Sequence, residues 1–449
     1  MRNRIRKQLR LVEPSIDHEH AKELHQIRAL ISEYPEILNR VHADLIRGLD
    51  DPEAGREGMM TAEQVFKVLL IKQMNGFSYG VLRFHLADSR TYRSFCGFGI
   101  GDAIPSESTL QRDIKKVLPE TLEGINRIIL GAAAEKGIEK GRKVRVDCTV
   151  TESNIHRPTD SSLLFDSARV LCRLTQRARE GFGVKVSDHS RRAKKRAMGI
   201  LNAKNDKVRT KHYRDLLKVT KRTVADAECV MAFLKAVPTG SVMTAAGICA
   251  ELARYIPLAR RVIEQTERRV LLGEKLKPEE KLVSIFEPHT DIIVKDRRKT
   301  YYGHKLAVTG GESGLLTDLV IEEGNPADAA IAEKMIARQQ DIYGRVPRQA
   351  AFDGGFASGG NLASIKALGV RDVAFAKKRG LKVSDMAKST WVYKRLRDFR
   401  AGIEGMISFL KRCVGLTRCT WRGFESFKAY AWSSVVTANL LLMARRMLA

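Results

Sequence analysis

The chain has 449 residues, 44% of them hydrophobic, so it can bury sizeable cores, and its length is typical of roughly two to four domains. It carries 79 Lys and Arg against 52 Asp and Glu, a formal net charge of +27 that favours a polyanionic partner. Seven cysteines without a C-x-x-C pair indicate neither a zinc site nor a disulfide framework. No signal peptide is evident, and the apolar stretch 429–444 is short for a membrane span, so a cytoplasmic location is expected.

The first 140 residues are predicted to be helical, with a basic segment at the start. Residues 1–60 are expected to form a basic arm and a helical lead-in, and the arm, MRNRIRKQLR, is either a DNA contact or a disordered tail. Thr61 and Gln64 fit a capping box ahead of an apolar helix. Residue 61 is therefore the expected start of a helical domain, 61–140.

One helix of this domain has a basic outer face. Ser108 and Gln111 fit a second capping box, and Arg112, Lys115 and Lys116 of that helix are expected to point outward. Short helices with such a face suit a helix-turn-helix domain that binds DNA. A plain helical packing module fits the same pattern, and both interpretations stay open.

The α/β core is predicted to begin with residues 141–165. Asp147 stands among alternating β-branched residues in VRVDCTV, a pattern typical of a buried strand. A structural hydrogen-bonding role explains an isolated buried aspartate as well as a chemical one does. Asn154 and Asp160 follow and can support a site at Asp147, although turn chemistry explains them almost equally, with Asp160 as a helix N-cap.

Residues 166–279 are predicted to be a helical domain inserted into this core. About 200 residues separate Asp147 from Asp353, far more than the intervening strands and helix need, whereas only about 50 separate Asp353 from Glu404. The insertion holds a large share of the net positive charge, densest in RRAKKRAMGILNAKNDKVRTKHYR. This composition fits a nucleic-acid-binding surface, a solvated helix face or a basic loop without a defined role.

Residues 280–449 are predicted to complete the core as alternating strands and helices. Strands are expected in TDIIVKDRRKTYYGHKLAVTG, LLTDLVIEEG, VPRQAAFD and VRDVAFAKK, with helices beginning at Asn325 and spanning NLASIKALG. The fold class is therefore α/β (α+β), a mixed sheet flanked by helices. Asp353 ends the third of these strands, and Gly354 and Gly355 allow a sharp turn and a close approach to a phosphate.

A later helix carries a carboxylate flanked by cations. Arg397, Arg400, Glu404, Ser408 and Lys411 share one helical face, and a second, apolar face is formed by Phe399, Ile403, Ile407, Leu410 and Val414. The arrangement suits a hard metal ion on Glu404 with phosphates held on either side. A solvated face with an Arg400–Glu404 ion pair is the ordinary alternative.

The spacing R-x3-E-x6-K, formed by Arg400, Glu404 and Lys411, resembles the signature of DDE transposases from bacterial insertion sequences. The family pattern has a Tyr three residues before the Arg, where this chain has Arg397. Other blocks similar to the family follow in family order: DCTVTESNIHRPTDSSLL, RRKTYYGHK, EEGNPAD, FDGGFAS and IEGMISFLKRCVGL. The resemblance extends from about residue 61 to the end of the chain.

The resemblance implies a ribonuclease-H-like core with Asp147 on the first strand, Asp353 after the fourth and Glu404 on a later helix. These carboxylates are expected to be catalytic and to hold two Mg2+ or Mn2+ ions per active site, with Asp147 bridging them. The implied partners are double-stranded DNA, as terminal repeats and target, and a second copy of the chain in a synaptic complex associated with the nucleoid. The expected DNA-binding residues are Arg397, Arg400, Lys411, Arg112, Lys115, Lys116, His304 and Lys305, with Gly354, Gly355, Asn154 and Asp160 in supporting positions.

Two other functions remain compatible with the sequence. A hydrolytic nuclease on the same fold would keep the three carboxylates without end recognition or strand transfer. A transposase-derived DNA-binding protein would have lost catalysis. The tryptophans Trp391, Trp421 and Trp432 are expected in the core, with base stacking near a cut end as the alternative.

Overall fold

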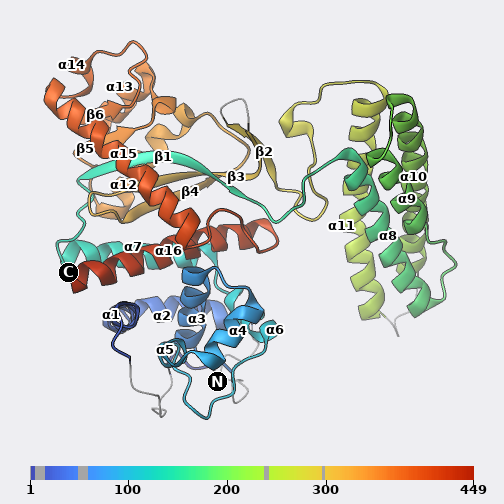
Figure 1. Ribbon diagram of the computed structural model, residues 1–449, viewed down its shortest axis with the longest axis horizontal. Coiled ribbons are helices and arrows are strands. Elements are labelled where there is room, and N and C mark those ends of the chain that lie inside the picture. Colours follow the sequence, from blue (N-terminus) through green and yellow to red (C-terminus); the bar gives the residue numbers. More distant parts are fainter. Residues whose placement is uncertain (1, 6–15, 49–58, 237–241, 296–298) are drawn as a thin grey trace. The chain divides into compact units, whose positions relative to one another are not determined.

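The computed structural model describes residues 2–5, 16–48, 59–236, 242–295 and 299–449. The chain divides into two units, the first made of Met1–Glu152 and His304–Ala449 and the second of Ser153–Gly303 (Figure 1). The second unit thus begins earlier and ends later than the insertion expected at 166–279, and the domain boundaries drawn from the sequence remain predictions.

Helices precede the sheet of the first unit, as expected from the sequence. They are α1 (Glu19–Glu33), α2 (Glu36–Ile46), α3 (Ala62–Asn75), α4 (Tyr79–Asp88), α5 (Arg90–Phe95), α6 (Glu107–Ile114) and α7 (Pro119–Glu135). The capping box expected at Thr61 and Gln64 is present at the start of α3. The second expected cap is wrong by two residues, because Ser106, not Ser108, accepts from the backbone of Thr109 and opens α6.

The described part of the basic N-terminal segment packs into the fold. Arg2 is 1% exposed and donates to the carbonyl of Met60 at 3.0 Å and to the Asp113 carboxylate at 2.7 Å. The backbone carbonyl of Asn3 accepts from Ala62 N at 3.1 Å. Arg2 therefore anchors its part of the segment to α6, whereas the DNA contact or tail expected of the rest concerns residues 6–15, which lie outside the described residues.

The sheet is mixed and six-stranded. Its strands are β1 (Lys143–Glu152), β2 (Asp291–Lys295), β3 (Lys299–Gly310), β4 (Leu316–Glu322), β5 (Gln349–Phe352) and β6 (Asp372–Phe375), in the order β2-β3-β1-β5-β6 with β4 paired to β3. β1, β5 and β6 pair in parallel, and β3 pairs antiparallel with β2 and β4. The expected α/β fold with a mixed sheet and flanking helices is confirmed, and it is consistent with a ribonuclease-H-like core.

Two expectations about the order of elements were wrong. The stretch from Thr290 to Gly310 forms two strands, β2 and β3, so Asp353 follows the fifth strand and not the fourth. The helix expected at Asn325 starts later, as a 3-10 turn over Asp328–Ile331 followed by α12 (Ala332–Tyr343). The reason is that Lys305 Nζ binds both the carbonyl of Pro326 and the carboxylate of Asp328, which holds this segment out of a helix.

Alternate residues of β1 face opposite sides of the sheet. Val144 and Val146 belong to the buried cluster that includes Met335 and Ile336 of α12. Asp147, offset by one residue, faces α15 (Thr390–Cys413), which crosses β1, β5 and β6. A strand with a period of two therefore gives one face to the core and the other to a polar site.

The remaining helices of the first unit are α13 (Gly359–Ala367), α14 (Val383–Met386) and α16 (Phe424–Leu448), and α16 packs on α7 and β4. Asn439 of α16 is fully buried and bonds both backbone groups of Leu316 and the side chain of Asn126. Within the described residues, no helix has the length and apolar character required for a membrane crossing.

The tryptophans divide between core and surface. Trp421 and Trp432 are buried as expected, at 3% and 5% exposed. Trp391 is 63% exposed and stacks under Arg395 at 4.8 Å, so its expected burial is wrong. Trp391 lies in the first turn of α15, and its side chain points to solvent, whereas Tyr393 of the same turn is buried in the core.

The long helices of the second unit form a bundle with its own core, and the unit also includes β2. Its helices are α8 (Asp160–Phe182), α9 (Ser190–Leu201), α10 (Asp206–Lys235) and α11 (Val242–Thr266), seen at the right of Figure 1. Thr159, not Asp160, caps α8. Asp160 instead accepts from Gln265 and Arg269, so it ties the start of α8 to the end of α11.

Candidate active site

Three carboxylates meet at one guanidinium. Arg400 Nη2 lies 3.4 Å from Asp147 Oδ2 and 3.1 Å from Asp353 Oδ1, and Arg400 Nη1 lies 3.2 Å from Glu404 Oε1. The side chains of Arg400 and Asp147 are 16% and 17% exposed, whereas Asp353 and Glu404 are 40% and 67% exposed. The cluster is therefore mostly buried at Asp147 and open to solvent at Glu404.

Each carboxylate comes from a different element. Asp147 projects from β1, and its Oδ1 also accepts from the backbone of Cys148 at 2.7 Å. Asp353 directly follows β5, which pairs in parallel with β1. Glu404 is one turn beyond Arg400 on α15, so the ion pair expected from the i,i+4 spacing is present.

A packed contact seats α15 on the sheet next to Asp147. Arg145, two residues earlier on the same face of β1, donates from Nη1 to the carbonyl of Phe399 at 3.0 Å and lies 4.5 Å from its ring. Lys143 approaches the same ring at 4.2 Å. A Cβ at Gly402 would stand 2.0 Å from Arg145 Nη1, so any side chain there would have to displace the guanidinium that binds the Phe399 carbonyl. Burial lowers the pKa of Arg145. The hydrogen bond from its guanidinium to Phe399 sets the distance between β1 and α15.

The turn after Asp353 is tightly packed. A Cβ on Gly354 would lie 2.9 Å from Cβ and Cγ of Lys377, and one on Gly355 would lie 2.4 Å from Oδ2 of Asp328. Neither glycine has a positive φ. Close side-chain neighbours thus account for both glycines, and an approach to phosphate stays a prediction.

The donor set fits a divalent cation by its chemistry. Three carboxylates carry three formal negative charges and Arg400 returns one, which leaves two, and carboxylate oxygens are the ligands that Mg2+ and Mn2+ prefer. Among the described residues, no three His, Cys, Asp or Glu side chains stand together in a metal-binding group. In this structure the guanidinium is the positive charge that the three carboxylates share.

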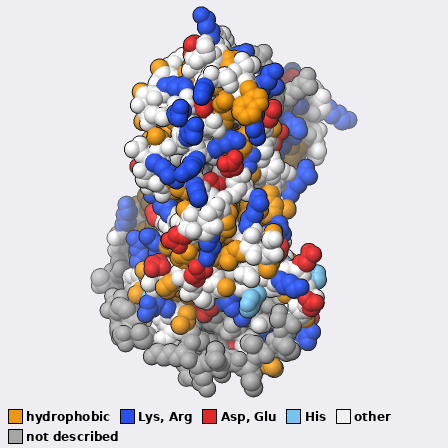
Figure 2. Space-filling view, turned by 90° about the vertical axis from the view of Figure 1, so that its left-hand side faces the viewer, with side chains coloured by type: hydrophobic (Ala, Val, Ile, Leu, Met, Phe, Trp, Pro, Cys, Tyr) orange, Lys and Arg blue, Asp and Glu red, His pale blue; other side chains and the backbone are white. Residues whose placement is uncertain are grey.

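The loop after β6 brings a cation next to the turn that follows Asp353. After β6 the chain carries the exposed residues Lys377, Lys378, Arg379 and Lys382, here called the basic loop. Lys377 adjoins the turn at Gly354, next to Asp353. In Figure 2, Lys and Arg side chains gather over the upper part of the face, and α14 lies on this side of Figure 1.

The other predicted site residues lie in different settings. Arg397 is exposed on α15, and Lys411 is partly buried near the end of that helix. His304 is 1% exposed and packs against Phe424 and Phe427 at ring distances of 4.9 and 4.7 Å. A packing role for His304 therefore replaces the expected DNA contact.

Lys305 is also an internal residue, 9% exposed and bound to Asp328 at 2.9 Å, so its expected DNA contact is corrected to a structural role. On α6 and just after it, Arg112 is exposed while Lys115 and Lys116 are partly exposed. DNA binding by these three side chains stays a prediction. Asn154 is exposed and, like Asp160, belongs to the second unit.

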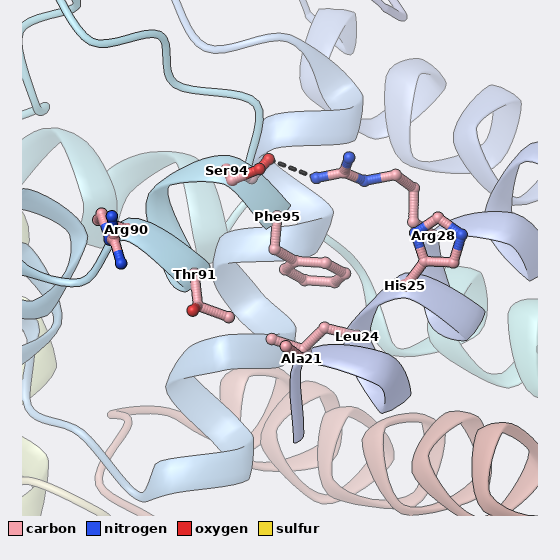
Figure 3. A pocket seen from close by; sticks show the side chains of 8 residues that line it. All are labelled: Ala21, Leu24, His25, Arg28, Arg90, Thr91, Ser94 and Phe95. Atoms are coloured by element: carbon pink, nitrogen blue, oxygen red, sulfur yellow. Dashed lines mark hydrogen bonds between the residues drawn. The ribbon is translucent and has the colours of Figure 1, made fainter. Parts of the chain in front are cut away.

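A small pocket lies apart from the carboxylates, among the N-terminal helices. Figure 3 shows Arg28 of α1 extending to the backbone carbonyl of Ser94, which accepts a hydrogen bond from it, with Phe95 beside them. The pocket volume of about 50 Å³ has room for water and little more. It has no evident part in the chemistry of the carboxylate cluster.

Sequence reasoning missed three features of this site: Arg145, Asp328 and the basic loop. Arg145 was detectable, because a charged residue two positions before Asp147 lies on the same face of the strand. The basic loop is visible as KKRGLK after a predicted strand. Asp328 ends the family-like block EEGNPAD, but only the fold brings it to Lys305 and to Gly355.

Comparison with protein families gives two matches, to a transposase domain (DUF772) over residues 12–116 and to a transposase DDE domain over residues 287–440. The two ranges together span more than half of the chain; the second includes Asp353 and Glu404, and Asp147 lies outside both. No curated protein and no solved structure matches the chain. The chain therefore belongs to the DDE transposases of insertion sequences, DNA-binding enzymes of DNA transposition that generally use divalent metal ions.

Proposed function

We propose that Asp147, Asp353 and Glu404 form the catalytic site at which this transposase cuts DNA at the ends of its element and joins the ends to a target. The observation that carries the proposal is the meeting of all three carboxylates, from β1, the end of β5 and α15, on Arg400. Carboxylates far apart in sequence that share one cation form a preorganised acidic site. An ordinary solvated helix face would involve only Arg400 and Glu404.

The three carboxylates would hold two Mg2+ or Mn2+ ions. When bound, such ions activate an attacking oxygen and stabilise the leaving oxygen in an in-line displacement at phosphorus. The exposed side of the cluster, at Glu404 and Asp353, is where a DNA phosphate can enter. Water as attacking group gives cleavage, and a DNA 3′-hydroxyl gives strand transfer, so one site serves both steps.

Arg400 has two tasks in this proposal. Before DNA and metal arrive, its guanidinium neutralises part of the repulsion among the carboxylates. Once they arrive, the same side chain can bind a phosphate oxygen, since a planar guanidinium binds carboxylate and phosphate in the same way. Arg397 and the basic loop supply further phosphate contacts around the open side.

Recognition of the element ends is assigned to the N-terminal helices. Arg112 is exposed on α6, and Arg2 holds this helix in place through its ion pair with the buried Asp113. The two ends must be held together for joining, so a homodimer is the expected minimal synaptic complex.

The test is Mg2+- or Mn2+-dependent cleavage and joining of labelled element-end DNA by wild type and by Glu404→Gln, Asp353→Asn and Asp147→Asn. We expect each variant to bind the DNA with wild-type affinity but to lose cleavage and joining by at least about 10³-fold, as for removal of a group acting in the transition state. Arg112→Gln serves as the contrasting variant, with weakened end binding and intact carboxylates.

The products separate this proposal from its two alternatives. Joined strands support a transposase with this active site, and nicked strands without joining indicate a hydrolytic nuclease. Binding without any product from wild type indicates a DNA-binding protein that has lost catalysis. Equal products from wild type and Glu404→Gln would show that Glu404 is not part of the catalytic site.

A further inference from the structure

Helix α10 of the second unit carries a line of exposed cations along one face. The members are Lys207, Lys211, Arg214, Lys218 and Arg222, all exposed, and we refer to them as the α10 stripe. Their steps of three and four residues keep them on one side of an α-helix. The first and last members are about 22 Å apart along the helix axis, at about 1.5 Å per residue.

The stripe has no carboxylate to compensate it. Within the part of the chain that the structure describes, none of its five members forms an ion pair. The four carboxylates of α10 all bind side chains outside the stripe. Asp206 binds Arg209, Asp215 binds Arg192 and Arg196 of α9, Asp226 binds His189, and Glu228 binds Arg260. The carboxylates of the helix are thus paired with other residues of the second unit, and the stripe keeps its positive charge.

The helix that carries the stripe is firmly held. Its opposite face contributes buried residues to the core of the bundle, among them Leu216, Val219, Val224 and Val230. It packs against α8, α9 and α11. The positions of the five cations along the stripe are therefore fixed by a rigid scaffold, while each long side chain stays free to reach a phosphate.

We propose that the α10 stripe binds the phosphate backbone of duplex DNA. The inference rests on the proposed function, because it assumes a chain that acts on DNA, and it assigns a role to the second unit. Duplex DNA carries about one charge per 1.7 Å of its axis, so 22 Å of duplex holds roughly 13 phosphates on its two strands, more than twice the five cations of the stripe. Contacts of this kind position the DNA and do not read its sequence.

The experiment measures binding of the full-length chain to a fluorescent 30-base-pair duplex of arbitrary sequence, as anisotropy over a range of KCl concentrations and without divalent metal. The stripe variant changes Lys207, Lys211, Arg214 and Lys218 to Gln. Each lost phosphate contact lowers the slope of log K against log salt by about 0.9. We expect the slope to fall by between about 1 and 4, and affinity at 0.1 M KCl to fall at least about 10-fold.

A matched control removes the same charge from the same unit. It changes four exposed cations outside the stripe, Arg173, Lys235, Arg254 and Lys275, to Gln. We expect its slope and affinity to stay close to those of wild type. If stripe and control variants lose the same affinity and slope, net charge alone governs binding and the proposal is overturned; it is overturned also if neither variant changes.

Two further measurements keep the outcome clear. Thermal melting by circular dichroism checks that both variants fold, and Lys211→Gln with Lys218→Gln replaces the fourfold variant if that one does not. The cleavage assay with element-end DNA is run in parallel. Loss of cleavage in the carboxylate variants with an unaffected stripe variant would retain the proposed function and reject the stripe. Wild-type binding that depends on the stripe but gives no product would do the reverse.

Discussion

Replacement of Arg400 by Ala should destabilise the metal-free protein and make it respond more strongly to divalent cations. The guanidinium and Asp147 are both mostly buried, so their contact at 3.4 Å, with the packing of the arginine stem, is worth about 1–2 kcal/mol. The side chains of Asp353 and Glu404 are 40% and 67% exposed, so their ion pairs with Arg400 add only a few tenths of a kcal/mol each. The expected loss is therefore about 2 kcal/mol.

A loss of this size is measurable by calorimetry or circular dichroism. For a unit of about 300 residues, a loss of about 2 kcal/mol corresponds to a fall in Tm of roughly 3 °C in EDTA. In wild type a cation must displace Arg400, whereas in the variant it meets three carboxylates without a competitor. A tenfold tighter site adds about 1.4 kcal/mol of stabilisation at saturating Mg2+, so the gain in Tm on adding 10 mM Mg2+ should be larger in the variant.

Arg397→Ala is the control, since it removes an exposed arginine from the same helix one turn earlier. It should leave both the Tm in EDTA and the response to Mg2+ unchanged. If Arg400→Ala has the same Tm as wild type in EDTA and gains no more than wild type from Mg2+, the guanidinium does not neutralise the cluster.

Three other substitutions test the fold around the site. Asn439→Leu removes the acceptor of the Leu316 N–H, the donor to Asn126 Oδ1 and one of two side-chain donors to the Leu316 carbonyl. Urea unfolding should show a loss of about 3–5 kcal/mol, and a loss below about 1 kcal/mol would contradict this network. Lys72 is 4% exposed, and burial lowers its pKa to about 8. Below pH 8 the charged, buried side chain therefore lowers the free energy of unfolding of wild type by roughly 3 kcal/mol. This loss of stability diminishes as pH rises toward 10.5, the pKa of the side chain in the unfolded chain. Lys72→Met should therefore raise Tm at pH 7 and remove part of the rise in stability between pH 8 and 10.5; an unchanged pH profile would refute the burial argument. Gly402→Ala places a Cβ 2.0 Å from an arginine guanidinium of β1, so we expect strand cleavage to slow by at least about 10-fold with DNA affinity retained, whereas unchanged cleavage would show that the helix tolerates the shift.

The candidate site shows where sequence reasoning succeeds and where it stops. The Arg400–Glu404 pair was available from the sequence as the alternative to a metal site, because residues four apart on a helix are neighbours wherever that helix packs. The extension of that pair to Asp147 and Asp353 depended on family resemblance, since nothing local joins residues about 200 positions apart. His304 and Lys305 were expected at the DNA, but burial against Phe427 and beside Asp328 gives them structural roles. Burial depends on neighbours that the local sequence does not name.

By itself, the sequence determined the local structure and the likeness to a family. The cap at Thr61, the alternation around Asp147 and the amphipathic face of α15 follow from hydrogen bonds and periodicities within a few residues. Only the tertiary structure decided which charges are neutralised. It directs Arg400 to three carboxylates and pairs three of the four acids of α10 with residues outside that helix, so that, among the described residues, the cations of the α10 stripe form no ion pair. The physical reason is that an ion pair depends on distance in space, and the packing of whole elements sets that distance.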